Sequence, residues 1–126
     1  MSGVVYDTGA LLAAERRHRG LWALHEQSLA SGVRPIVPVV VLARAWRGAP
    51  HANLSRLLRG CLVMPDTEDL GKAAGALCGR TGTSDVVDGL VVVTALRQGA
   101  LVVTSDPDDL QHLASSLHSK LALVTV

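Results

Sequence analysis

Three aspartates in widely separated segments are the residues of this sequence best suited to chemistry. Asp7 and Asp106 each follow a short apolar run, and Asp88 lies near the start of a longer one. Hard divalent cations such as Mg²⁺ take oxygen ligands, commonly one or two carboxylates together with waters and substrate phosphates. Brought together by the fold, the three side chains could share one metal ion. Asp85 precedes Asp88 by three residues, so both can lie on one helix face, and Asp85 is a further candidate ligand.

Helix capping explains the same aspartates without any function. Aspartate is a favoured N-cap, and each of the three precedes or opens a predicted helix. In a parallel sheet, the helices that follow the strands all begin at one edge, so capping alone would bring Asp7 and Asp106 to that edge. Taken singly, each aspartate is explained as well by a cap as by a metal ligand. Taken together, the three favour a metal site.

The elements that would position these residues alternate along the chain. Short apolar strands are predicted at 3–6, 34–37, 61–64, 101–104 and 121–126. Helices are predicted at 10–17, 21–30, 38–46, 53–59, 65–78 and 85–98 and from Pro107 onward, with a loop at 79–84. This alternation is typical of an α/β fold with a parallel sheet covered on both faces. In such sheets, active sites lie beyond the carboxyl ends of the strands, where Asp7 and Asp106 are expected.

The segment 85–98 is ambiguous by itself. Its valine content favours a strand, whereas its length favours a buried helix. We predict a helix, which places Asp88 in its first turn.

Composition and charge narrow the class of protein. The chain has 126 residues, 48% of them hydrophobic, which fits one domain spanning 1–126. Its net charge of +1 argues against indiscriminate binding of nucleic acid. Residues 1–63 hold eight Lys/Arg against three acids, so +5, and residues 64–126 hold four against eight, so −4. A basic face beside an acidic pocket suits a protein that handles a phosphate backbone through bound cations, although arginines that merely solvate helix faces give the same count.

The remaining polar residues predict no second kind of site. Cys61 and Cys78 lack a CxxC spacing and are expected as free, buried thiols. The five histidines show no HExxH motif and are expected at the surface. No signal peptide and no apolar run long enough to span a membrane is evident, so we expect a cytoplasmic protein with no membrane partner.

Three segments carry a pattern of a known family in their order and spacing. They read VVYDTGALLA at 4–13, DGLVV at 88–92 and VVTSDPDDL at 102–110. They resemble the PIN domain and, more narrowly, the VapC-like toxins of bacterial toxin–antitoxin pairs. The resemblance implies a three-layer α/β/α sandwich around a parallel sheet.

The resemblance also implies a function. Members of the family are typically Mg²⁺- or Mn²⁺-dependent endoribonucleases whose acidic residues hold metal that activates water for attack on an RNA phosphodiester. By resemblance, Asp7, Asp88 and Asp106 are the catalytic and metal-binding acids. Arg16, Arg17, Arg19 and Arg47 are candidates for steering RNA, a cognate antitoxin would inhibit by covering the pocket, and a homodimer is expected.

One position departs from the family pattern. The family usually has a glutamate in the helix after the second strand, and Arg44 falls at that position here. Arg44 could lower the affinity for metal, pair with an aspartate and fill the pocket, or bind a substrate phosphate. Two hypotheses follow: a VapC-like ribonuclease toxin, or a degenerate PIN-like module that binds RNA or a partner protein without cutting.

Overall fold

At the centre of the computed structural model, which describes residues 3–126, lies a sheet whose strands are all parallel. Within these residues the strand order is β3-β2-β1-β4-β5. The strands are β1 (Val4–Tyr6), β2 (Ile36–Pro38), β3 (Leu62–Met64), β4 (Leu101–Thr104) and β5 (Leu123–Thr125). Val5 of β1 is in register with Ile36 of β2 and with Val102 of β4. Because β1 and β4 are parallel neighbours, the residues that follow them emerge side by side at one edge of the sheet.

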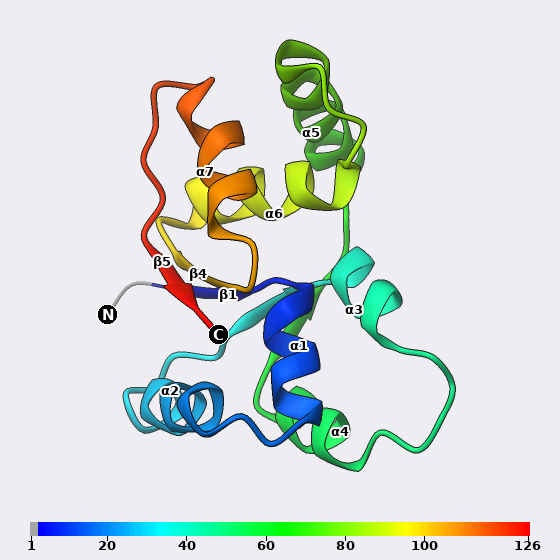
Figure 1. Cartoon of the computed structure of the whole chain (residues 1–126), viewed down its shortest axis with the longest axis vertical. Coiled ribbons are helices and arrows are strands. Elements are labelled where there is room, and N and C mark those ends of the chain that lie inside the picture. Colours follow the sequence, from blue (N-terminus) through cyan, green and yellow to red (C-terminus); the bar gives the residue numbers. More distant parts are fainter. Residues whose placement is uncertain (1–2) are drawn as a thin grey trace.

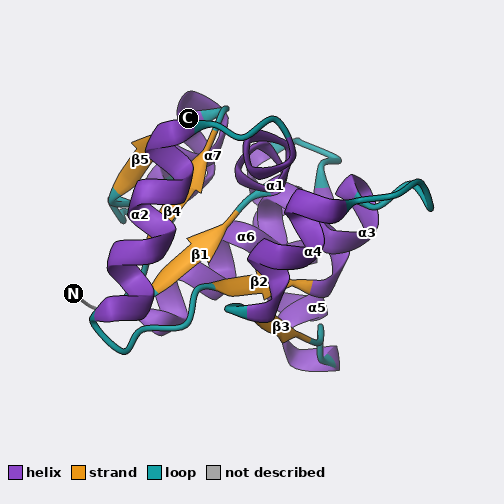
Figure 2. Ribbon diagram, turned by 90° about the horizontal axis from the view of Figure 1, so that it is seen from below, coloured by secondary structure: helices purple, strands orange, loops and turns teal. Residues whose placement is uncertain are grey.

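Helices cover both faces of this sheet (Figure 1). One layer contains α1 (Thr8–Glu15), α2 (Arg19–Ala30) and α4 (Ala52–Arg59), which lie in front of the strands in Figure 2. The other layer contains α5 (Glu68–Thr81), α6 (Val86–Gln98) and α7 (Pro107–Ser115). The short helix α3 (Val39–Ala45) follows β2 and packs against α1. The predicted three-layer α/β/α sandwich is confirmed.

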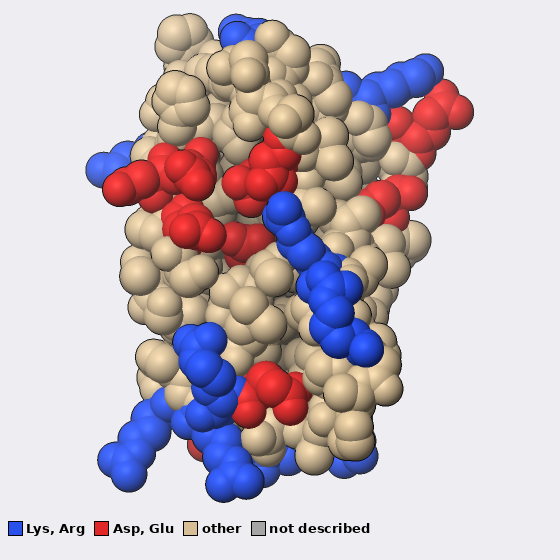
Figure 3. Space-filling view, turned by 45° about the vertical axis from the view of Figure 1, so that its right-hand side comes forward, with Lys and Arg blue, Asp and Glu red and all other residues tan. Residues whose placement is uncertain are grey.

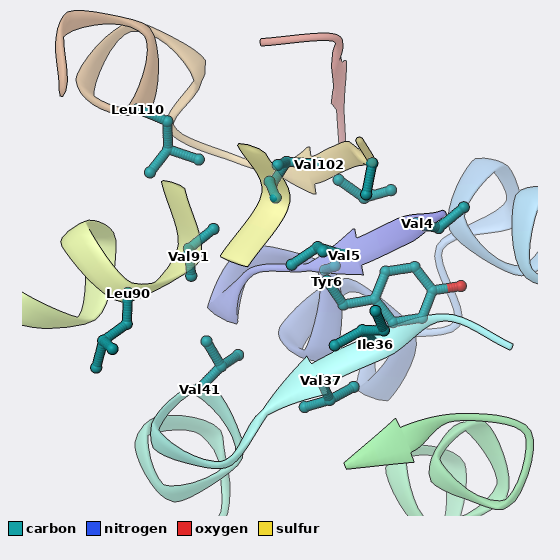
Figure 4. Packing of buried hydrophobic residues seen from close by; sticks show 14 of the residues in the cluster. Val4, Val5, Tyr6, Ile36, Val37, Val41, Leu90, Val91, Val102 and Leu110 are labelled. Carbon is teal, nitrogen blue, oxygen red and sulfur yellow. The ribbon is translucent and has the colours of Figure 1, made fainter. Parts of the chain in front are cut away.

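The central strands are buried because both of their faces are covered. Every residue of β1 has 0% exposure, as do Val102 and Val103 of β4. Figure 4 shows Val91 and Leu110 approaching the sheet from α6 and α7, and Val41 from α3. Burying each such side chain stabilises the fold by roughly 1.5–3 kcal/mol. This packing fixes the positions of the carboxyl ends of β1 and β4.

Helix α6 resolves the ambiguous segment in favour of the predicted helix. Its residues from Gly89 to Ala95 are all buried, because α6 is enclosed by the sheet, α5 and α7. A Cβ at Gly89 would lie 2.9 Å from the Cys78 sulfur, so glycine lets α6 pack closely on α5. Val91, Val92 and Val93 are buried on successive sides of the helix, which removes the periodic pattern that a surface helix would show.

Most predicted boundaries differ from the structure by one to three residues, and two of the differences bear on the elements around the aspartates. The predicted loop at 79–84 is wrong at its start, because α5 continues to Thr81 and ends at Gly82, whose φ is +73°. The Thr81 hydroxyl donates to the Leu77 carbonyl and extends the last turn. Pro38, predicted in the first turn of a helix, is instead the last residue of β2 and the N-cap of α3.

The prediction that all histidines lie at the surface is wrong for His25. Its side chain is 3% exposed, and its Nδ1 lies 2.8 Å from the Tyr6 hydroxyl. The buried hydroxyl needs a hydrogen-bond partner, and α2 supplies one from the face that it turns toward β1. Cys61 and Cys78 are free and buried, as predicted. Among the described residues, no helix combines the length and the apolar character that crossing a bilayer requires.

Candidate functional site

The carboxyl ends of β1 and β4 and the start of α6 enclose an acidic cavity. Asp7 follows β1, Asp106 follows β4, Asp85 is the N-cap of α6, and Asp88 lies in the first turn of that helix. The cavity has a volume of about 270 Å³. Its lining consists of Asp7, Thr8, Gly9, Leu12, Arg44, Asp85, Asp88, Ser105, Asp106 and Asp109. Figure 3 shows acidic side chains gathered on this face of the molecule, with basic side chains beside them.

Asp7 is the most rigidly held acid of the cavity. It is 4% exposed, and both of its carboxylate oxygens accept hydrogen bonds: Oδ1 from the Thr8 backbone N–H at 2.8 Å and Oδ2 from the Thr104 hydroxyl at 2.7 Å. Burial raises the pKa of Asp7, and the Thr104 and Thr8 hydrogen bonds oppose that rise. The side chain therefore has one orientation, at a buried position beneath the cavity.

Thr104 connects the two strand ends. Its hydroxyl donates to Asp7 and accepts from the backbone N–H of Asp106 at 2.9 Å. Thr104 itself has 0% exposure, so its hydroxyl has no water as an alternative partner. Together with the hydrogen bond from the Asp7 backbone N–H to the Val103 carbonyl, this side chain holds Asp7 beside the segment that carries Asp106.

Gly9 allows the same two segments to come into direct contact. A Cβ at Gly9 would lie 2.2 Å from the Ser105 hydroxyl oxygen and 2.7 Å from the Ser105 backbone nitrogen. No larger residue fits this space unless α1 or the turn after β4 moves. The close approach narrows the cavity between Asp7 and Asp106.

Asp88 shows that negative charge is crowded in the cavity. Burial, then repulsion by Asp85 and Asp7, raises its pKa to about 7, and Arg44 opposes the rise. No hydrogen bond to the Asp88 carboxylate is present in residues 3–126. A cation in the cavity would stabilise the ionised carboxylate that burial and repulsion disfavour.

The capping explanation applies to Asp85 but not to all the other aspartates. Asp85 Oδ1 accepts a hydrogen bond from the Asp88 backbone N–H at 3.1 Å, which is a helix cap. Among the helix N–H groups, Asp7 accepts only from that of the first helical residue, Thr8, and Asp106 makes no side-chain capping bond. Within the described chain, capping therefore leaves the carboxylates of Asp88 and Asp106 unexplained.

Arg44 lines the cavity and pairs with an aspartate, which one of the three sequence alternatives allowed, but it does not fill the cavity. Its guanidinium lies 3.4 Å from the Asp85 carboxylate, and both side chains are more than a third exposed. Exposed pairs of this kind are worth about 0–1 kcal/mol, so the pair can open at little cost. With five carboxylates and one guanidinium, the lining has a formal charge of −4.

Solved structures with the same fold come from toxin–antitoxin complexes. A chain of VapBC2 from Rickettsia felis, crystallised with a DNA fragment from its promoter, matches with a TM-score of 0.72 and 17% identity, over 98% of each chain. A chain of a toxin–antitoxin complex from Klebsiella pneumoniae matches with a TM-score of 0.66 and 15% identity, over 85% of this chain and 89% of that one. No protein-family model and no curated protein matches the sequence. The chain has the PIN-like fold.

The donor set of this PIN-like cavity fits a hard divalent cation. All the acidic groups offer oxygen, which Mg²⁺ and Mn²⁺ prefer, and among residues 3–126 no histidine or cysteine lines the cavity. In the part of the chain that the structure describes, no three Asp, Glu, His or Cys side chains are arranged to hold an ion as they stand. One or two carboxylates completed by waters and substrate oxygens is the usual coordination of Mg²⁺, and the cavity offers that many.

Of the five arginines expected to contact substrate, only Arg44 lines the PIN-like cavity. Arg16 lies at the carboxyl end of α1, whereas Asp7 lies at its start, so about 12 Å of helix separates them. Arg47 donates to the backbone carbonyls of Ala43 and Arg44 and thereby caps the end of α3. The spacing of residues along the chain could not reveal that the side chains of Arg16 and Arg47 lie away from the cavity.

Sequence reasoning missed Thr104 and Asp109 as parts of the site. Asp109 lines the cavity because it lies three residues after Asp106, on the same face of the first turn of α7. It also lines an adjoining cavity of about 250 Å³ that reaches His112. Thr104 could have been found from the sequence, because its hydroxyl stands at the last position of an otherwise apolar strand.

Proposed function

We propose that the chain is a VapC-like, metal-dependent endoribonuclease that hydrolyses RNA phosphodiester bonds. The observation that carries the proposal is the acidic cavity at the carboxyl ends of β1 and β4, in which Asp88 and Asp106 have carboxylates that cap no helix. Ligands of parallel α/β sheets bind at this edge. The likeness to chains of toxin–antitoxin complexes supports the same assignment.

Asp7, Asp88 and Asp106 are the proposed metal-binding and catalytic residues, with Asp85 beside them. Bound Mg²⁺ or Mn²⁺ would lower the pKa of a water molecule and offset the charge that develops on the phosphate. Asp7, held by Thr8 and Thr104, supplies a fixed carboxylate at the buried end of the cavity. Asp106 is exposed and makes no capping bond, so it can accept a hydrogen bond from the attacking water.

Arg44 is assigned to the substrate in this proposal. Its side chain is 45% exposed, and within residues 3–126 its guanidinium contacts only the Asp85 carboxylate, at 3.4 Å. Arginine binds phosphate oxygens through paired N–H groups, so a phosphodiester entering the cavity would compete for Arg44. An arginine at this position then contributes to RNA binding and not to metal binding.

The proposed partners are a cognate antitoxin and a second copy of the chain. Both matched structures are described as toxin–antitoxin assemblies. Beside the cavity, Leu12 is 44% exposed and Val86 is 53% exposed, so the rim offers apolar surface to a protein partner. A protein bound there would cover the aspartates and block RNA.

A paired comparison of two neighbouring aspartates tests the proposal. Asp106→Asn and Asp108→Asn change the same residue type at the start of α7, but only Asp106 lines the cavity. With Mn²⁺ and a labelled RNA, the parent and Asp108→Asn are expected to cut, whereas Asp106→Asn loses about 10³-fold in kcat/KM. Equal activity in the two variants, or no cleavage by the antitoxin-free parent, would count against the assignment.

Titration of Mn²⁺ separates the enzyme from a non-cutting module. Saturable binding to the parent that is lost in Asp7→Asn supports a working metal site. If the parent binds no Mn²⁺ and Arg44→Glu restores binding, Arg44 has disabled the cavity. The chain would then be a degenerate PIN-like module that binds RNA or a partner protein.

A further inference from the structure

A second cavity lies away from the acidic one, where the turn after α1 meets α2 and α4. Its volume is about 540 Å³. Its lining consists of Arg17, Arg19, Trp22, Ala23, Glu26, Asn53 and Arg56. Figure 3 shows basic side chains gathered at the lower end of the molecule, the part formed by these three helices. We call the lining around Arg17, Arg19 and Arg56 the arginine surface.

The arginines of this surface are free to bind a ligand. Within residues 3–126, the guanidinium groups of Arg17, Arg19 and Arg56 make no hydrogen bond and no ion pair, whereas Arg97 is paired with Asp69 on another face. Glu26 is the one acid in the lining. The surface thus holds an excess of unneutralised positive charge in a hollow.

The arginine surface is also held in shape. The Trp22 indole N–H donates to the Ala14 carbonyl at 3.1 Å, which fixes the ring, and the Arg56 guanidinium lies 4.1 Å from the ring centroid. Arg17 has a φ of +61°, a left-handed conformation that costs a non-glycine residue free energy and turns the chain sharply between α1 and α2. Binding an anion here would require little reordering of the backbone or of Trp22.

We propose that the arginine surface binds phosphates of the RNA strand outside the cavity where the strand is cut. The inference rests on the proposed ribonuclease function. The cutting cavity has a formal charge of −4, so it repels an RNA backbone unless cations offset that charge. Affinity for the strand must then come from cations elsewhere, and α1 runs from Asp7 at its start to Arg17 just beyond its end. A strand that follows α1 for about 12 Å reaches both.

Single-stranded RNA suits this surface for a second reason. Arg56 and Trp22 present a planar guanidinium on an aromatic ring, the kind of pair on which nucleobases stack. Arg17 and Arg19 can contact the phosphates on either side of a nucleotide whose base stacks there. An acidic peptide would bind the positive charges of the arginine surface but would not use the Arg56–Trp22 pair for stacking.

The test measures binding of a fluorescent single-stranded RNA to the full chain in EDTA, which prevents cleavage, over a range of salt concentrations. The variant is the double substitution Arg17→Gln with Arg19→Gln. The control is Arg80→Gln with Arg97→Gln, which removes the same charge from exposed arginines of α5 and α6. Thermal unfolding establishes that both variants are folded.

The variant is expected to bind RNA about tenfold more weakly than the control, with the slope of log affinity against log salt reduced by about 1.4 for two lost contacts. Glu26→Gln is expected to bind more tightly than the parent. Equal losses in variant and control would overturn the inference, because binding would then follow net charge alone. Absence of RNA binding by the parent, or binding of polyglutamate in place of RNA, would overturn it as well.

The two proposals can fail separately. If binding depends on Arg17 and Arg19 but Mn²⁺ produces no cleavage, the ribonuclease assignment fails and the arginine surface stands. If the parent cuts RNA and the double variant binds like the control, the cavity assignment stands and the arginine surface is wrong.

Discussion

The two ends of α1 carry opposite charges that are held in opposite ways. At its start, carboxylates crowd a cavity built on the buried strands β1 and β4, and Asp7 is 4% exposed. Just beyond its end, Arg17 and Arg19 are exposed and unpaired among the described residues. Burial, and then repulsion by Asp85 and Asp7, raises the pKa of Asp88 to about 7, so its ionised form is disfavoured without a cation. The comparison teaches that buried strands can hold mutually repelling carboxylates close together. Exposed arginines need no such support, because water solvates each of their charges.

The largest expected effect comes from a steric conflict at the acidic start of α1. Gly9→Ala places a methyl group against Ser105, and we expect a loss of about 3 kcal/mol of stability together with loss of Mn²⁺ binding. Gly75→Ala is the matched control, because nothing lies near its Cβ position in α5. That change should stabilise the protein by about 1 kcal/mol. Urea unfolding measures both, and two variants of equal stability would contradict the close contact.

The next effect removes the buried hydroxyl that joins the two strand ends. Thr104→Val leaves Asp7 Oδ2 and the Asp106 N–H without their partner, and we expect a loss of about 2 kcal/mol. Thr94→Val is the control, because the Thr94 hydroxyl is buried in α6 without a hydrogen-bond partner in the described structure. That change should be neutral or stabilising. A cost as large for Thr94→Val as for Thr104→Val would show that packing, and not the hydrogen bonds, decides.

A smaller effect appears in the pH dependence of stability. Asp88 has a pKa of about 7 in the folded chain, above its ordinary value of 3.8, so the folded state binds more protons than the unfolded state between these values. Its contribution to stability is therefore complete below pH 3.8 and is lost as the pH rises through 7. In EDTA, Asp88→Asn should be more stable than the parent at pH 8 by on the order of 1 kcal/mol, allowing for solvent screening, and equal to it near pH 4. Thermal unfolding at both pH values measures this, and a difference that does not change with pH would contradict it.

The smallest effect belongs to the basic end. Arg56→Gln removes the guanidinium from the face of Trp22, and we expect a loss of about 0.5 kcal/mol, as for an exposed cation–π contact. Arg59→Gln, one turn along α4, is the control and should cost less. Unfolding by urea, followed by tryptophan fluorescence, gives both values. A loss of several kcal/mol at Arg56 would mean that the arginine surface is a structural element and not a free binding surface.

Prediction from sequence succeeded where local pattern and tertiary structure agree. The strand 101–104 was predicted with the bounds of β4, because a run of β-branched residues ends at a helix start marked by Asp106 and Pro107. The helix at 85–98 was predicted on length, and its enclosure between α5 and the sheet explains its valines. The end of α5 was missed, because Gly79 was taken as the start of a loop. Gly79 stays helical, and the helix ends at Gly82, which adopts the left-handed conformation of a helix cap.

By itself, the sequence determined the alternation of strands and helices and hence the edge of the sheet at which Asp7 and Asp106 lie. These features depend on periodicity and on residues that start or stop helices, which are local properties. Only the tertiary structure decided which carboxylates cap helices, that Thr104 joins the strand ends, and that Arg44, and not Arg16 or Arg47, reaches the cavity. Side-chain direction, burial and the mutual repulsion of charges arise between segments far apart in the chain, so no local pattern encodes them.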